Sequence, residues 1–169
     1  MTRWRPAGER KSPYITPEGY ARLQEEQQAL WARRHEVTAA LAAAAAEGDR
    51  SENAEYIYRK KELREIDRRI RYLQKRLPDL TVVTETAGKR GRIYFGCWVT
   101  VEDEAGREST YRIVGPDELD PSKGWISMDS PVARALLGKA LDDEVTVATP
   151  AGTARYYITA LGYVPPDEV

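Results

Sequence analysis

Two acidic residues, Asp49 and Glu52, are the side chains of this sequence best placed for chemistry. They stand three positions apart in segment 48–53, where one helical pattern ends and another begins. Carboxylate oxygens suit hard cations such as Mg²⁺, but a magnesium ion keeps several waters and usually shares phosphate oxygens. Two carboxylates alone therefore predict an incomplete site that a partner would have to complete. The same spacing is typical of an acidic capping box at a helix start, and spacing alone leaves both interpretations open.

Cysteine and histidine are scarce. The chain has one cysteine, Cys97, and one histidine, His35, which excludes an intramolecular disulfide and any site built from several thiolates or imidazoles. A Cys–His nucleophilic pair is disfavoured, because His35 lies in a polar helical pattern and Cys97 in a strand-like one. We expect a solvated helical histidine and a small buried cysteine. Any metal chemistry must then use carboxylates.

A basic stripe on segment 54–77 is the second candidate site. The segment holds nine basic and four acidic residues. Several basic side chains follow steps of three or four positions and so share one helix face. These are Lys60, Arg64, Arg68, Arg71 and Lys75, with Lys61 beside them. Neighbouring like charges repel, so the stripe suggests contact with the phosphates of RNA or DNA. A solubilising face is the alternative.

A long first helix is predicted over 17–46. Thr16 and Pro17 suit the N-cap and the first helical position. Apolar residues then recur at spacings of three and four, which defines a coiled-coil seam with Gln27 and Arg34 as polar interruptions. At a rise of ~1.5 Å per residue this helix would be ~45 Å long, so it must project from a domain of this size.

The second helix is predicted over 54–77, with its own apolar seam. Asp49 or Ser51 is the expected start of this helix, after Gly48 ends the first one. Two seams joined by a short turn predict an antiparallel hairpin. Its tip, at about 47–54, carries the two carboxylates away from the rest of the chain.

From residue 79 onward the composition changes to the Val, Ile, Thr, Tyr and Gly content of short strands and turns. Strands are predicted over 92–102, 109–114, 125–128, 144–148 and 154–164. Ser130 and Pro131 predict the start of a short helix over 132–137. The predicted fold class is α+β, with a helical hairpin followed by an antiparallel sheet that carries one helix. We expect an N-terminal tail over 1–13, a hairpin domain over 14–78 and a sheet domain over 79–169.

Length and composition limit the function classes. A chain of 169 residues is too short for a large barrel or a doubly wound enzyme. Its 41% apolar content is enough for a core, and its formal net charge is -1. No apolar run reaches the length of a membrane span, and no hydrophobic stretch follows the basic start. These features predict a cytoplasmic protein.

Five ordered segments resemble the bacterial Gre transcript cleavage factors. They are ITPEGY at 15–20, GDRSENAEY at 48–56, LREIDRRI at 63–70, FGCWV at 95–99 and ISMDSPVARALL at 126–137. The resemblance covers about residues 14–164. The arginine-rich second helix and the run YRIVG at 111–115 are more similar to the GreB branch than to the GreA branch.

The resemblance implies an N-terminal coiled-coil hairpin and a C-terminal domain of FKBP-like fold. It further implies that the hairpin enters the secondary channel of backtracked RNA polymerase and stimulates the polymerase's own cleavage of the RNA. The residues matching Asp49 and Glu52 would help hold the second Mg²⁺, jointly with the polymerase, and orient the attacking water. Arg50, Ser51 and Asn53 would support the tip.

Further implied contacts lie outside the tip. The stripe Lys60, Lys61, Arg64, Arg68 and Arg71 would guide the RNA 3′ end through backbone contacts that do not depend on sequence. The segment Asp129, Ser130 and Pro131 would dock on the polymerase at the rim of the channel. We expect a monomer that is not itself an enzyme.

Other functions remain open from the sequence. The same arm would serve an inhibitor that plugs the channel and traps magnesium, although such relatives usually carry a more acidic tip. An independent metal nuclease is disfavoured because only two ligands come from one turn. In a coiled-coil adaptor without chemistry, Asp49 and Glu52 would only cap a helix.

Overall fold

The computed structural model describes residues 10–47, 53–84 and 91–168. The chain divides into two compact units. One unit is Glu18–Leu80, and the other joins the described residues of 1–17 to those from Thr81 onward. Within the described residues, no helix is both long enough and apolar enough to cross a membrane.

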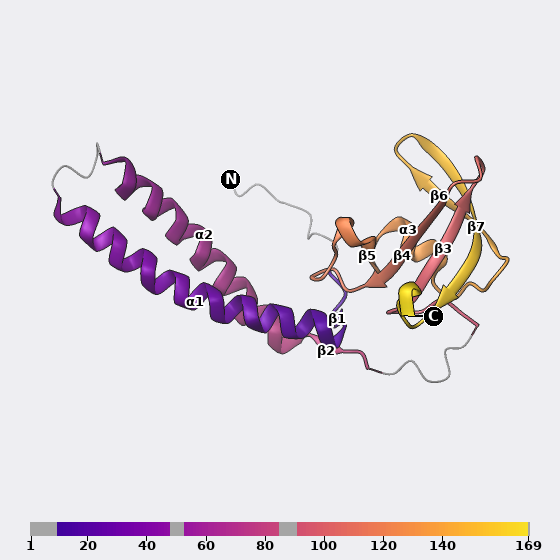
Figure 1. Ribbon diagram of the computed structural model, residues 1–169, viewed down its shortest axis with the longest axis horizontal. Coiled ribbons are helices and arrows are strands. Elements are labelled where there is room, and N and C mark those ends of the chain that lie inside the picture. The colour runs from indigo at the N-terminus through magenta and orange to yellow at the C-terminus, as the bar shows by residue number, and fades with distance from the viewer. Residues whose placement is uncertain (1–9, 48–52, 85–90, 169) are drawn as a thin grey trace, which may run out of the picture. The chain divides into compact units, whose positions relative to one another are not determined.

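The first unit is an antiparallel helical hairpin (Figure 1). Helix α1 spans Pro17–Ala46 and helix α2 spans Ala54–Arg76, followed by a 3₁₀ turn, η1, at Leu77–Asp79. Pro78 supplies no backbone N–H for a continued α-helix, which accounts for the change of helix type.

The expected seams form the packed face of the hairpin. An apolar cluster there joins Val37 of α1 to Ile66 and Ile70 of α2, with Leu30 and Leu63 packed against it. Residues three or four apart lie on the same side of a helix, so these side chains meet along one line. The spacing that predicted a coiled coil is therefore confirmed.

The second unit is built on a five-stranded sheet in the order β5-β4-β3-β7-β6. The strands are β3 Trp98–Asp103, β4 Glu108–Val114, β5 Trp125–Ser127, β6 Glu144–Thr149 and β7 Gly152–Gly162. All neighbouring pairs are antiparallel except β4 and β5, which run parallel. The predicted α+β fold class is confirmed, with this one parallel pair at the edge.

Helix α3, Pro131–Leu136, packs on one face of the sheet (Figure 1). Its Ala133 and Leu136 are fully buried against Val99 and Val101 of β3. Successive residues of a strand point to opposite faces, so the alternate valines of β3 turn toward the helix. This layer holds the core of the sheet domain.

A short sheet that the sequence did not predict joins strand β1, Tyr14–Ile15, to strand β2, Thr81–Val82. The two strands run parallel, with backbone hydrogen bonds from Thr81 to Pro13 at 2.7 Å and from Val83 to Ile15 at 2.9 Å. These bonds place residues 14–17 with the sheet domain. By spatial contacts the hairpin unit is Glu18–Leu80, whereas the hairpin domain expected from the sequence spans 14–78.

The turn that follows β4 lies close to this short sheet. A Cβ atom at position 115 would lie 2.0 Å from the carbonyl oxygen of Tyr14, so only glycine fits there.

The structure also differs from the sequence prediction in the strand expected to begin at residue 92. Residues 92–97 form turns, and β3 begins at Trp98, because Ile93 bonds to Lys139 rather than to a sheet neighbour.

Candidate functional site

The start of α2 is capped by Asn53. Its side-chain oxygen accepts hydrogen bonds from the backbone N–H groups of Glu55 at 3.1 Å and Tyr56 at 3.2 Å. These are two of the donors that the first turn of a helix leaves without a partner. The expected start at Asp49 or Ser51 is corrected, because Asn53 holds the N-cap position.

The same side chain reaches the other helix. The Asn53 amide nitrogen donates to the carbonyl oxygen of Ala44, in the last turn of α1, at 3.1 Å. One amide therefore joins the end of α1 to the start of α2. Four of the predicted tip residues, Asp49, Arg50, Ser51 and Glu52, lie outside the described residues.

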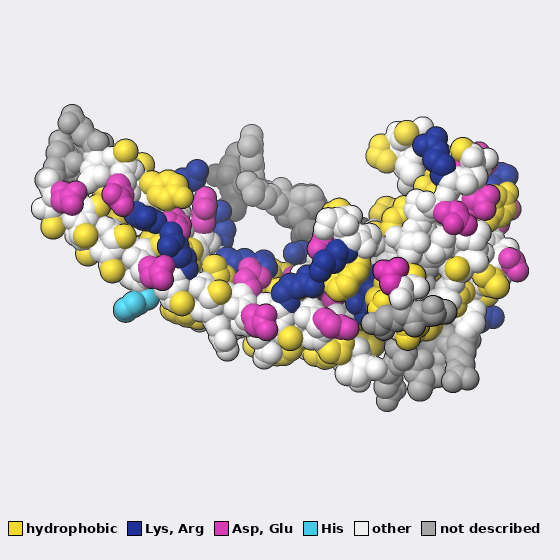
Figure 2. All heavy atoms as spheres, in the orientation of Figure 1, with side chains coloured by type: hydrophobic (Ala, Val, Ile, Leu, Met, Phe, Trp, Pro, Cys, Tyr) yellow, Lys and Arg dark blue, Asp and Glu magenta, His cyan; other side chains and the backbone are white. Residues whose placement is uncertain are grey.

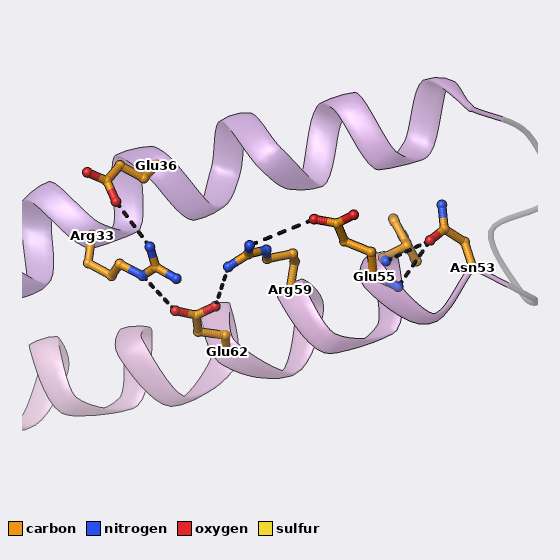
Figure 3. Close-up of polar contacts among 7 residues, drawn as sticks. Arg33, Glu36, Asn53, Glu55, Arg59 and Glu62 are labelled. Atoms are coloured by element: carbon orange, nitrogen blue, oxygen red, sulfur yellow. Dashed lines mark hydrogen bonds and ion pairs between the residues drawn. The ribbon is translucent and has the colours of Figure 1, made fainter.

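A row of charged side chains runs along the hairpin toward the tip (Figure 3). Arg33 of α1 donates to Glu62 of α2 at 2.7 Å and also pairs with Glu36 at 3.1 Å. Glu62 in turn pairs with Arg59 at 3.1 Å, and Arg59 reaches Glu55 at 3.7 Å. The hydrogen bond from Arg33 is the main cause that lowers the pKa of Glu62.

Two further ion pairs join the helices. Arg69 donates to both carboxylate oxygens of Glu26, at 2.6 and 3.0 Å. Arg34, one of the expected polar interruptions of the seam, pairs with Asp67 at 2.7 Å. A forked guanidinium contact of the Arg69 kind adds orientation as well as energy.

These pairs sort the charges of α2 into two groups. Glu55, Glu62 and Asp67 are engaged with arginines within the hairpin. The five predicted stripe residues are exposed, and no ion pair joins them to another described residue. They are Lys60, Lys61, Arg64, Arg68 and Arg71. The basic charge of these five side chains is therefore not neutralised by ion pairs within the described part of the hairpin. Figure 2 shows dark blue Lys and Arg side chains along the hairpin.

Local contacts within the stripe are weak. The Lys60 ammonium lies 5.8 Å from the centre of the Tyr56 ring, and the Arg64 guanidinium donates to the Lys60 carbonyl at 3.4 Å. Two apolar side chains of the same turn, Ile57 and Tyr58, are 53% and 62% exposed. This part of α2 thus presents cations, an aliphatic side chain and an aromatic ring to solvent.

The docking segment starts α3. Ser130 is the N-cap, as predicted, and accepts a hydrogen bond from the N–H of Ala133 at 3.3 Å. The Asp129 carboxylate is held by Ser12, whose backbone N–H donates at 2.9 Å and whose hydroxyl donates to the second oxygen. Pro131 is exposed. The contact between Ser12 and Asp129 was not predicted, because nothing local in the sequence relates positions so far apart.

The cysteine and the histidine behave as expected. Cys97 is fully buried, and burial raises the pKa of its thiol. His35 is exposed on α1 and is the cyan side chain of Figure 2. A buried thiol with a raised pKa is a poor nucleophile. Among the described residues, no group of three or more His, Cys, Asp or Glu side chains is arranged to hold a metal ion.

Comparison with known proteins gives a consistent result. Residues 13–82 match the model of the N-terminal domain of the GreA/GreB transcription elongation factors, and residues 88–163 match that of the C-terminal domain. The chain belongs to the GreA/GreB family. The resemblance seen in the sequence motifs is thereby confirmed, and the two family domains correspond in order to the hairpin and the sheet domain.

Several GreB proteins are similar to this GreA/GreB family member over nearly their whole length. Transcription elongation factor GreB of Pseudomonas aeruginosa is 57% identical over 98% of this chain and 99% of its own. GreB of Yersinia pestis is 57% identical over 94% and 93% of the two chains. GreB of Vibrio vulnificus is 48% identical over 90% and 97%. The predicted similarity to the GreB branch is therefore confirmed.

Solved structures of related factors also match. GreA factor homolog 1 (Gfh1) of Thermus thermophilus is 27% identical over 90% of this chain and 99% of that chain, with a TM-score of 0.42. A GreA/GreB elongation factor from Nitrosomonas europaea is 28% identical over 56% of this chain and 79% of that chain, with a TM-score of 0.41.

Proposed function

We propose that this protein is a transcript cleavage factor that acts on bacterial RNA polymerase. The hairpin enters the secondary channel of a backtracked complex and stimulates the polymerase's own cleavage of the extruded RNA. The protein is thus not itself the enzyme, and it works in the cytoplasm as a monomer. The observation that carries the proposal is the sorting of charge on α2. Three of its four acids, Glu55, Glu62 and Asp67, pair with arginines of the hairpin, while its basic face stays open.

The tip would supply metal ligands. Asp49 and Glu52 fit a hard cation in kind, because carboxylate oxygens suit Mg²⁺, but two ligands are too few for a tight site. The factor would therefore hold the ion only jointly with the polymerase. When bound there, Mg²⁺ activates water and stabilises the charge that develops during phosphodiester cleavage. Arg50 and Ser51 would keep the two carboxylates oriented.

The basic stripe would contact RNA phosphates. The chain of an extruded RNA 3′ segment carries one negative charge per phosphate, and Lys60, Lys61, Arg64, Arg68 and Arg71 offer exposed cations along one helix. Contacts of this kind position a nucleic acid without reading its sequence. They also release counterions, so the interaction weakens as salt rises.

The segment Asp129, Ser130 and Pro131 would dock the sheet domain on the polymerase. Ser130 already caps α3, so its side-chain oxygen serves the fold. Pro131 is exposed at the first turn of the helix. This leaves the Asp129 carboxylate, oriented by Ser12, as the charged group available to a partner.

Transcript cleavage in a stalled, backtracked complex tests the proposal. Labelled RNA is incubated with polymerase and Mg²⁺, and wild type is compared with Asp49→Asn and Glu52→Gln at matched concentrations. We expect shortening with wild type, no stimulated shortening with either variant, and unchanged binding of both variants to polymerase. A reaction without polymerase excludes an independent nuclease when the RNA stays intact.

Two results would contradict the proposal. Full cleavage with both variants would remove the carboxylates from the mechanism. Slower nucleotide addition by wild type, without any shortening, would favour the inhibitor that plugs the channel.

The role of the stripe has its own test. Lys60→Glu combined with Arg64→Glu should weaken crosslinking to the RNA 3′ end and lower the salt dependence of the interaction, by about 0.7 in slope for each phosphate that the variant no longer neutralises. Arg107→Glu, an exposed charge reversal in the turn between β3 and β4, is the matched control. Unchanged crosslinking in the double variant would contradict this role.

A further inference from the structure

We propose that Asn53 is a positioning residue. It fixes the distance between the end of α1 and the start of α2, which together carry the tip. This inference rests on the proposed cleavage function and deepens it. The relevant geometry is the simultaneous contact of one side chain with both helices. Its oxygen accepts from the N–H groups of Glu55 and Tyr56, and its nitrogen donates to the carbonyl of Ala44.

Only an amide of this length makes both sets of bonds. The oxygen of Asn accepts and its nitrogen donates, so the side chain serves α2 and α1 at once. Aspartate is an equally good N-cap but has no donor when ionised, and its second oxygen would face the carbonyl of Ala44. The N-cap function alone therefore does not account for asparagine at position 53, whereas the link to Ala44 does.

Apolar packing becomes thin where this link occurs. Ala44 is the last buried residue of α1, and its side chain is a single methyl group. On α2 the first buried residue is Ile66, more than three turns beyond Asn53. Polar contacts take over in between, with the pair between Arg33 and Glu62 at 2.7 Å and the Asn53 bond at 3.1 Å. Among the hydrogen bonds and ion pairs that join α1 and α2 within the described residues, the bond from Asn53 to Ala44 lies nearest the tip.

The position of this contact explains why it matters for cleavage. The carboxylates of Asp49 and Glu52 must reach an ion that the polymerase also holds. Small displacements of reacting groups cost catalysis steeply, on the order of 100-fold for ~1 Å. Freeing one chain end from the other would let the two carboxylates spread over many positions, without removing either of them.

The isolating variant is Asn53→Asp. It keeps a capping oxygen at a favourable place near the positive end of the helix dipole, so α2 should still form. It removes the donor to Ala44. Asn53→Ser is the second variant, because a hydroxyl keeps the cap but is too short to bond both helices. Asp120→Asn, a cap change in the 3₁₀ turn Pro121–Lys123, is the control for a capping substitution as such.

Two readouts are measured. The first is the distance distribution between spin labels on cysteines introduced at Ala43 and Tyr58, both exposed, in the free full-length protein. The native Cys97 is fully buried, so the spin label should react with the introduced cysteines and not with Cys97. The second is cleavage as a function of factor concentration, which separates the maximal rate from the half-saturating concentration.

We expect both position 53 variants to broaden the distance distribution. The maximal cleavage rate should fall on the order of 10- to 100-fold, with the half-saturating concentration and the helical circular dichroism nearly unchanged. Asp120→Asn should leave the distribution as in wild type. An unchanged distribution in Asn53→Asp would overturn the proposal. So would a broadened distribution with full maximal cleavage, because the link would then not position the tip for the reaction.

The spin-label result does not depend on polymerase. If wild type itself stimulated no cleavage, the proposed function would fail, and the distance measurement would still decide whether Asn53 holds the two helix ends together.

Discussion

The carboxylate of Glu118 accepts a hydrogen bond from the backbone N–H of Thr16 at 2.7 Å, although 102 positions separate the two residues. The Thr16 hydroxyl donates to the other carboxylate oxygen, and the N–H of Gly115 donates at 3.0 Å. Both Thr16 and Glu118 are almost completely buried. Thr16 and Glu118 belong to the same compact unit, so this carboxylate ties the segment before α1 to the turn after β4 within the sheet domain.

Glu118→Gln should destabilise the sheet domain. A glutamine keeps the shape but replaces one accepting oxygen with an N–H₂ group that faces existing donors. Leaving buried donors without an acceptor costs about 1–3 kcal/mol. Chemical denaturation followed by tryptophan fluorescence measures the loss. Glu108→Gln, an exposed position on β4, is the control and should change stability by less than about 0.5 kcal/mol. Equal stabilities of the two variants would contradict the anchoring role.

The stability of the hairpin should fall in acid through Glu62. Its pKa in the folded protein lies below the ordinary value of 4.5, chiefly because of the hydrogen bond from Arg33. A lowered folded pKa contributes stability that is present above the unfolded value and is lost as the pH falls through the folded value. The thermal midpoint should therefore drop less between about pH 5 and about pH 3 in Glu62→Gln than in wild type.

Glu65→Gln is the matched control for this pH dependence. Glu65 is an exposed acid on the same helix. The thermal midpoint of Glu65→Gln should fall in acid as much as that of wild type. A Glu62→Gln curve parallel to that of wild type would show that the Arg33 contact does not stabilise the fold.

Ser12→Ala should affect both the sheet domain and its docking. The change removes the hydroxyl bond to Asp129 but leaves the backbone bond. The cost should be about 0.5–1.5 kcal/mol of unfolding free energy. Because the Asp129 carboxylate is then less well oriented, affinity for RNA polymerase should fall about two- to tenfold. Fluorescence anisotropy of labelled factor measures the affinity, with Ser122→Ala, in the 3₁₀ turn η2 at Pro121–Lys123, as the control. A loss of stability with unchanged affinity would restrict Ser12 to the fold.

Leu136→Ala should be among the most damaging substitutions in the sheet domain. The side chain is fully buried between α3 and the sheet, and its removal leaves a cavity. Such truncations cost about 2–5 kcal/mol. Leu141→Ala removes the same atoms from a side chain that is 51% exposed, and should cost much less. The difference in denaturation midpoints between the two variants measures the contribution of the core.

The helices and their packed faces were predictable because helical order is local. The bonds of an α-helix join residues four apart, and the seam spacing follows from 3.6 residues per turn. The bounds of α1 and the coiled-coil seams followed from this. The five ordered motifs, with the tip motif of segment 48–56 among them, also indicated the family. The cap of α2 nevertheless proved to be Asn53 rather than Asp49 or Ser51.

The tertiary structure decided the relationships between positions that lie far apart in the chain. Arg33 finds Glu62 and Arg69 finds Glu26 across 29 and 43 positions, which depends on the register of two helices and not on either helix alone. That register brings Glu62 and Asp67 of α2 against arginines of α1, while the basic face of α2 stays open. The pairing of β1 with β2, and the burial of Glu118 against Thr16, likewise depend on chain segments that meet only after folding. Sequence periodicity carries the geometry of one element, whereas a hydrogen bond or ion pair between elements also requires their relative placement.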